Sequence, residues 1–136
     1  MRKIGHLAAI AAAALSLGVF AAAATADDLD HAYEANVDYF TGPGCADLIS
    51  CAWDYPDYFA ISFKWWVPND YGYYHLPYAH GRSAKNRFND RKLQLIRKNG
   101  TFDGIVIACL DPNENRPDPG EFGYVKVGVL GSRCNN

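Results

Sequence analysis

Residues 58–67 alternate between apolar and more polar positions and predict a β-strand. Phe63 and Trp65 fall on one face of this segment, whereas Trp66 falls on the other. A period of two is typical of a strand with one buried face. The turn-forming sequence Pro68-Asn69-Asp70 then ends the strand.

Three further strands are predicted towards the C-terminus. Residues 93–98 and 101–110 flank Asn99-Gly100, and Asn-Gly between strand-like runs favours a tight hairpin turn, because both positions tolerate a positive φ. Residues 122–130 predict a last strand, with one face formed by Val125, Val127 and Val129.

The connecting segments have turn-forming or mixed sequences. Residues 111–120 hold three prolines and no apolar residue and predict an exposed loop. Residues 82–95 predict one or two helical turns, and residues 28–40 fit either a frayed helix or an extended arm. The expected fold is mostly β: a small antiparallel β-sandwich or barrel over residues 58–136, preceded by a disulfide-looped segment over residues 27–57.

The N-terminus has the three parts of a secretory signal peptide. A basic end at Arg2 and Lys3 precedes an apolar run over residues 7–19, and Ala24-Thr25-Ala26 supplies the small-x-small cleavage pattern. Cleavage after residue 26 of 136 leaves 110 residues, which is enough for one domain. A transmembrane anchor over residues 4–26 is the alternative, but its many alanines are weakly hydrophobic. We therefore expect a secreted, extracellular protein with no transmembrane segment after cleavage.

Charge is distributed unevenly along this expected mature chain. Loss of Arg2 and Lys3 leaves 11 basic against 15 acidic residues, a formal net charge of −4. Residues 27–58 hold eight acids and no Lys or Arg, whereas residues 82–98 hold seven bases and one acid. Either the acidic segment folds over the basic segment and the two screen each other, or the basic segment forms a face for an anionic partner.

All four cysteines, Cys45, Cys51, Cys109 and Cys134, lie in the part expected to be exported. An even number in a small secreted chain favours two disulfides. Of the three possible pairings we favour Cys45 with Cys51 and Cys109 with Cys134, because the first two share a short loop flanked by Gly and Pro. A zinc site is disfavoured, because no Cys or Cys/His pair has ligand spacing.

Eleven aromatic residues fall within residues 53–78. Core packing explains the half of these aromatic side chains that point inward. It does not explain Trp66, which falls on the opposite face of the strand from Trp65, or the tyrosines of residues 71–78, which Gly and Pro interrupt. We expect part of this set to form an exposed patch beside the basic segment, suited to anionic lipid head groups, glycans or single-stranded nucleic acid. The candidate binding residues are Trp66, Tyr73, Tyr74, His75, His80, Arg82, Lys85 and Arg87.

His75 and His80 fit several roles. They are five residues apart with no nearby carboxylate or thiol, which is poor for a metal site. Two imidazoles near Arg82 could instead cleave a phosphodiester by acid–base catalysis. Residues 71–75 resemble a stretch of the secreted microbial guanyl-specific ribonucleases, although that family has its catalytic glutamate where this chain has Leu76 and needs a later histidine. An ordinary role is hydrogen bonding at a strand-to-loop turn.

Residues 65–134, at most, resemble the lactococcin-972-type bacteriocin family. In that family a Trp-containing strand leads into Tyr-Tyr-His, four residues, and His-Gly-x-Ser, an order and spacing that residues 73–75 and 80–83 reproduce. Residues 119–124 and Arg133-Cys134 resemble later stretches of the family. Phe122 stands where Trp is usual, and residues 86–117 have no counterpart.

This resemblance implies a secreted β-sandwich that acts on bacteria by binding the wall precursor lipid II, and not an enzyme. We therefore expect a non-enzymatic antibacterial protein whose partner is a cell-envelope component, with no cofactor, no metal and no nucleic-acid partner. Two alternatives remain. One is a disulfide-stabilised binding or inhibitor module that presents residues 111–120 to a partner enzyme, and the other is a small hydrolase or ribonuclease that uses His75 or His80. The oligomeric state is left open.

Overall fold

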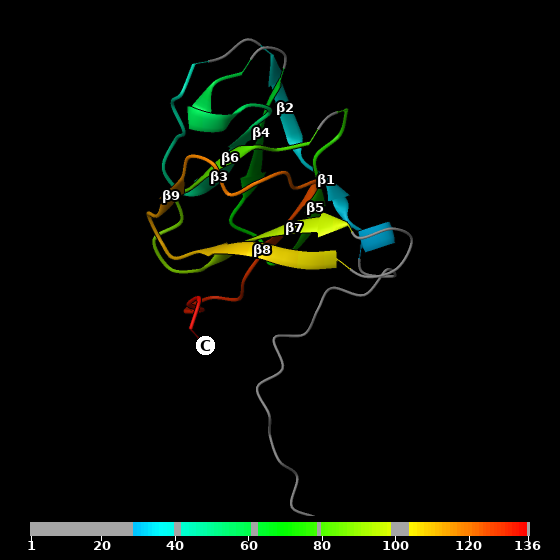
Figure 1. Cartoon of the computed structure of the whole chain (residues 1–136). Helices are drawn as coiled ribbons and strands as arrows, with labels where there is room; N and C mark the ends of the chain where they lie inside the picture. Colours follow the sequence, from blue (N-terminus) through cyan, green and yellow to red (C-terminus); the bar gives the residue numbers. More distant parts are fainter. Residues whose placement is uncertain (1–28, 40–41, 61–62, 79, 99–103, 136) are drawn as a thin grey trace, which may run out of the picture.

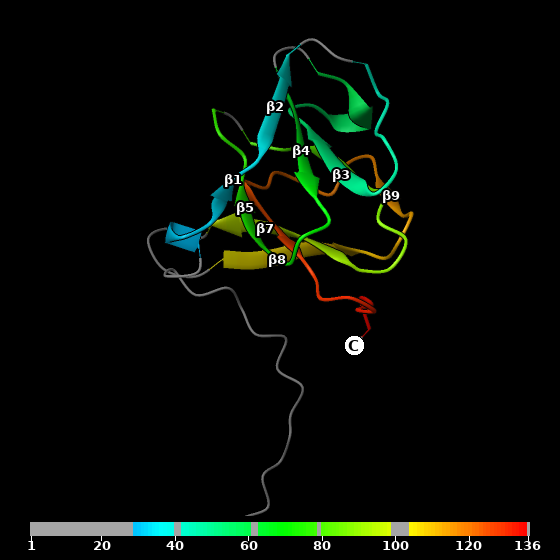
Figure 2. The same cartoon turned by 180° about the vertical axis from the view of Figure 1, so that it is seen from behind.

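The computed structural model describes residues 29–39, 42–60, 63–78, 80–98 and 104–135. Its strands form two five-stranded sheets packed against each other (Figures 1 and 2). The strand order is β1-β5-β10-β7-β8 in sheet A and β2-β4-β3-β6-β9 in sheet B. Neighbouring strands are antiparallel, except for the parallel pair β1 and β5. The prediction of a mostly β, antiparallel sandwich is confirmed.

The strands are short, and several are edge strands. Sheet A consists of β1 (Tyr33–Glu34), β5 (Gly72–His75), β10 (Tyr124–Val127), β7 (Leu93–Lys98) and β8 (Gly104–Leu110). Sheet B consists of β2 (Asn36–Tyr39), β4 (Phe63–Pro68), β3 (Ile49–Trp53), β6 (Ser83–Asn86) and β9 (Asn115–Arg116), and the 3₁₀ turn η1 (Pro56–Tyr58) follows β3.

The N-terminal segment is extended and contributes to both sheets. β1 pairs with β5 in sheet A and β2 pairs with β4 in sheet B. The buried Ala35 lies between these two strands, and its amide donates to the carbonyl of His75 at 2.8 Å. Over residues 33–39 the open choice between a helix and an extended arm is thus settled in favour of extended chain.

The core lies between the sheets and is built from the alternating strands. Trp65 of β4, Leu95 of β7 and Val125 of β10 are at most 2% exposed and pack in one apolar cluster. Phe88 and Phe122, which lie outside the strands, complete it. The period of two therefore identified the inward faces of β4 and β10 correctly.

Two predicted strands are shorter in the structure. β4 was expected to start at residue 58, but among the described residues it begins at Phe63. Tyr58 belongs to η1 and has a positive φ of 61°, which is incompatible with regular strand pairing. Residues 61–62 lie outside the described part. β10 ends at Val127, so Val129 is not on its buried face and is 56% exposed.

The predicted hairpin strands do pair with each other. β7 and β8 are antiparallel neighbours, with an irregularity in register between Leu95 and Ile96. Lys98 pairs with Gly104, whereas a two-residue turn would pair it with residue 101. The Asn99-Gly100 turn itself lies outside the described residues.

Residues 82–95 form no helix, which corrects that prediction. Residues 83–86 are strand β6, which pairs with β3 and β9. The loop predicted over residues 111–120 is mostly exposed or half-buried, and it contains only the two-residue edge strand β9.

Both favoured disulfide pairings are confirmed. Cys45 is bonded to Cys51 and Cys109 to Cys134. The first closes the loop between β2 and β3. The second ties the C-terminal segment to β8, and the amide of Cys134 also donates to Asp111 Oδ1 at 2.8 Å.

The buried amide of Asn86 joins distant parts of the chain at the end of β6. Its Oδ1 accepts hydrogen bonds from Ser50 Oγ at 3.1 Å and from the Phe88 amide at 3.0 Å. Its Nδ2 lies 3.0 to 3.2 Å from the carbonyl oxygens of Arg91, Leu110 and Asp111. Because buried polar groups are costly when unpaired, this one side chain fixes where sheet B meets the ends of β7 and β8.

Replacement of Asn86 by Ala should therefore lower the free energy of unfolding by roughly 2–4 kcal/mol, because buried partners lose their hydrogen bonds. Urea unfolding followed by tryptophan fluorescence, with both disulfides intact, measures this. Asn89→Ala, at an exposed position of the same residue type, should change the free energy by less than about 0.5 kcal/mol. Equal effects of the two substitutions would contradict the role assigned to Asn86.

Candidate functional site

The eight predicted binding residues do not share one surface. Trp66 and Lys85 alternate with core residues of sheet B and face outward from it, whereas Tyr73 and His75 face outward from sheet A. Tyr74 is 6% exposed and packs in the core between the sheets. The expectation of a single aromatic and basic platform is wrong, because β4 and β6 belong to one sheet and β5 to the other.

Part of the outer face of sheet B is covered by the loop before the Cys45–Cys51 disulfide, which includes Pro43 and Gly44. Lys85 Nζ donates to the carbonyl of Pro43 at 2.9 Å and lies 4.2 Å from the ring centre of Tyr58. Lys64 Nζ donates to the carbonyl of Gly44 at 3.0 Å. Burial lowers the pKa of the Lys85 amine. These lysines hold the covering loop and the half-buried Trp66 lies beside them, so this face offers little open basic surface.

Acids of the N-terminal segment pair with bases from later in the chain. Arg87 lies 2.7 Å from Asp47, and Lys98 lies 3.4 Å from Asp30. These contacts favour screening as the explanation of the uneven charge. Such exposed pairs contribute at most about 1 kcal/mol each to stability, so their main effect is to neutralise the basic segment.

The outer face of sheet A carries half-buried rings and a half-buried lysine. His75 at the end of β5 pairs across the sheet with Tyr124 of β10, and their ring centres are 5.0 Å apart. Tyr73 lies further along β5, and Lys126 Nζ lies 4.9 Å from its ring centre. Leu29 packs beside Tyr73 and Tyr124 and covers the buried Ile96 between them.

His80 lies next to Glu121 because two loop segments form a β-bridge. Gly81 and Phe122 exchange backbone hydrogen bonds of 2.6 and 3.0 Å. His80 Nδ1 and Glu121 Oε1 are in direct hydrogen-bond contact, and both side chains are more than half exposed. A β-carbon at Gly81 would lie 2.5 Å from the Phe122 ring, so the close approach of these segments requires glycine at this position.

Three cations surround the two histidines. The hydrogen bond from His80 lowers the pKa of the Glu121 carboxyl, and the charges of Arg82 and Arg97 lower it further. Lys98 lies close enough to His75 to affect its titration. We call His75, His80, Glu121 and Tyr124, together with Arg82, Arg97 and Lys98, the histidine cluster.

The imidazole of His75 is held in its neutral form more strongly than a free histidine. Burial lowers the pKa of His75, and the positive charges of His80 and Lys98 act in the same direction, whereas the carboxylate of Glu34 opposes them. A neutral imidazole at neutral pH can accept a proton or a hydrogen bond. The cluster thus holds a neutral histidine beside a histidine in contact with a carboxylate.

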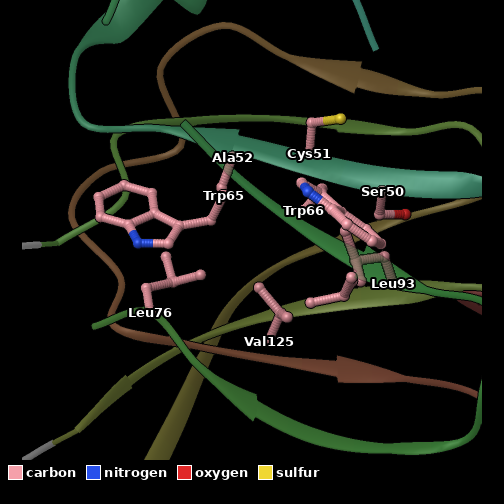
Figure 3. Close-up of a pocket in the computed structure, with 9 residues that line it drawn as sticks. Ser50, Cys51, Ala52, Trp65, Trp66, Leu76, Leu93 and Val125 are labelled. Carbon is pink, nitrogen blue, oxygen red and sulfur yellow. The ribbon is translucent and has the colours of Figure 1, made fainter. Parts of the chain in front are cut away.

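The pocket between the sheets does not offer an alternative ligand site. It has a volume of about 10 Å³ and a mostly apolar lining, which includes Trp65, Leu76, Leu93 and Val125 beside Ser50 (Figure 3). A volume of this size holds about one water molecule. Any ligand of the histidine cluster would therefore bind from the open surface.

Neither a metal-binding group nor a membrane-spanning helix is present among the described residues. In this part of the chain, no three His, Cys, Asp or Glu side chains are grouped so that they could hold a metal ion. The same part contains no helix of sufficient length and apolarity to span a bilayer.

Sequence reasoning found His75, His80 and Arg82 but missed Glu121, Tyr124, Arg97 and Lys98 as neighbours. Glu121 and Tyr124 were noted only as part of residues 119–124, which resemble a stretch of the bacteriocin family. No local spacing indicates that a residue 41 positions after His80 touches it. The bridge between Gly81 and Phe122, just before β10, brings them together.

Comparison of the chain with protein-family models, with curated proteins and with solved structures finds no match.

The electrostatic environment of His75 predicts two opposite shifts on substitution. Glu34→Gln removes a charge that favours the imidazolium and should lower the pKa of His75 further, whereas Lys98→Met removes an opposing charge and should raise it. An NMR titration of the histidine ring protons measures both values. The pKa of His75 in the folded protein lies below the ordinary value near 6.5, so the unfolded chain takes up the proton first. The free energy of unfolding should therefore decrease as the pH falls below about 6.5. Shifts of the same sign in both variants would disprove this account.

Proposed function

We propose that this protein is a secreted, non-enzymatic antibacterial protein that binds a phosphate-bearing component of the bacterial envelope, such as lipid II. The proposed binding surface is the outer face of sheet A together with the histidine cluster at its end. The observation that carries the proposal is the placement of Lys126 over the ring of Tyr73 on this face and of Arg97 close enough to Glu121 to affect its titration.

The charges on this face support an anionic ligand. Arg97 is exposed, and among the described residues neither Arg97 nor Lys126 has a carboxylate within salt-bridge distance. Arg82 and Lys98, by contrast, already face Asp118 and Asp30. Arginine forms strong, paired hydrogen bonds with phosphate oxygens. A pyrophosphate is thus expected to bind Arg97 first.

The rings and the disulfides fit the same proposal. Tyr residues favour the head-group level of a membrane, where a lipid-linked pyrophosphate lies. Two disulfides in a small chain are compatible with an oxidising, extracellular environment. The resemblance of residues 73–83 to the bacteriocin family points to the same class of ligand.

Lipid II in detergent micelles should bind the purified mature protein at micromolar concentration, as measured by isothermal titration calorimetry. Arg97→Ala should weaken this binding by about tenfold or more, because a charge-assisted hydrogen bond to phosphate is lost. Arg133→Ala removes the same charge from the exposed C-terminal segment and should leave the affinity unchanged. Absence of binding, or equal weakening in both variants, would reject the proposal.

Phosphodiester cleavage is a second candidate function, which the contact between His80 and Glu121 favours. Neutral His75 would accept the proton of an attacking hydroxyl, and protonated His80 would donate a proton to the leaving oxygen. Glu121 is the third polar partner that such a mechanism requires to orient His80.

A fluorogenic RNA substrate tests this second candidate. If the histidine cluster is catalytic, His75→Ala should reduce the turnover by about 100-fold or more. Equal turnover by the variant and the wild-type protein, or no turnover above buffer, would eliminate it.

A further inference from the structure

Four aromatic rings form a stack at one end of sheet B. Phe63 lies at its centre, with its ring centre 5.7 Å from that of Trp65 and 5.5 Å from that of Tyr78, at interplanar angles of 26° and 25°. Tyr39, its cross-strand neighbour on β2, lies 5.7 Å away at 60°. We call Trp65, Phe63, Tyr78 and Tyr39 the ring stack. It runs from a fully buried ring, Trp65, to Tyr78, which is 76% exposed.

The backbone holds Tyr78 at this exposed position at a conformational cost. Tyr78 has a φ of 74°, in the left-handed region that bulky residues rarely adopt. The residue before it is fixed, because Trp65 Nε1 donates to the carbonyl of Pro77 at 3.0 Å. Core packing does not explain the position of Tyr78, since most of its ring surface faces solvent.

The ring stack lies next to the histidine cluster in the sequence. Only one residue separates Tyr78 from His80, whose ring contacts Glu121 and which lies near Arg82. A ligand that spans both regions needs a flat apolar face for the rings and an anionic group for the cations. Sugar phosphates combine these two features, because the C–H groups on one face of a pyranose pack against aromatic rings.

We propose that the ring stack is a carbohydrate subsite, in which the pyranose ring of a phosphate-linked glycan packs on Tyr78 with Tyr39 beside it. The phenolic hydroxyls of both tyrosines can exchange hydrogen bonds with sugar hydroxyls. This inference rests on the proposed function, and it assigns the glycan part of the envelope ligand to residues outside the histidine cluster.

The disaccharide N,N′-diacetylchitobiose tests the subsite separately, because it carries no phosphate. It should bind the wild-type protein with a millimolar Kd, measured from chemical-shift changes of backbone amides. Tyr78→Asn should weaken this binding by about tenfold, and Tyr78→Phe should retain most of it. Asn removes the ring but tolerates the positive φ, so the fold should be unaffected. Tyr55→Ala, at another exposed tyrosine, is the matched control and should bind as the wild type does.

The outcomes separate this subsite from the proposed function. No saturable binding of chitobiose, or equal binding by Tyr78→Asn and wild type, would overturn the subsite even if lipid II binds through Arg97. Chitobiose binding that depends on Tyr78 and not on Arg97 would support it. If lipid II then fails to bind, the phosphate-binding function falls while the sugar subsite stands.

Discussion

Strand β10 lies between β5 and β7, and the hydrogen bonds of this central position bring together side chains that are far apart in the sequence. Tyr124 faces His75 on one side and Ile96 on the other. The chain just before β10 carries Glu121 to His80 through the bridge between Gly81 and Phe122. β5 and β7 are joined to each other through β10, and the segment just before β10 supplies the carboxylate in contact with His80. The arrangement of the candidate site is thus a property of the strand order in sheet A.

The sequence allowed β4, β7, β8, β10 and both disulfides to be predicted, but it missed the central strands β3, β5 and β6 and the edge strands β1, β2 and β9. The apolar residues of β4 and β10 that pack in the core recur with a period of two, whereas β7 buries both Leu95 and Ile96 and was predicted from its position in the hairpin. β1 and β2 are mostly exposed edge strands and carry no such pattern. Val129 is apolar but unpaired, and the hydrophobic pattern does not distinguish it from Val127. Spacing within one segment identified His75 and His80, whereas their partners depend on long-range pairing that local patterns do not contain.

The uneven charge of the chain is largely resolved within the fold. The acidic N-terminal segment passes through both sheets and supplies Asp30, Asp38 and Asp47 to bases of the later strands. Of the seven bases in residues 82–98, Arg87 and Lys98 pair with these acids, and Arg82 and Arg91 pair with the later acids Asp118 and Asp90. The cations that remain open on sheet A are few, and this makes recognition depend on their placement rather than on net charge.

The entry of the chain at Leu29 has a practical consequence. Leu29 packs against the face that carries Tyr124, and the next residue, Asp30, reaches Lys98. An affinity tag or fusion partner joined ahead of these residues would begin next to the histidine cluster and could block it sterically. A tag placed after Cys134, on the segment that the second disulfide anchors to β8, avoids the cluster and is the better choice for binding experiments.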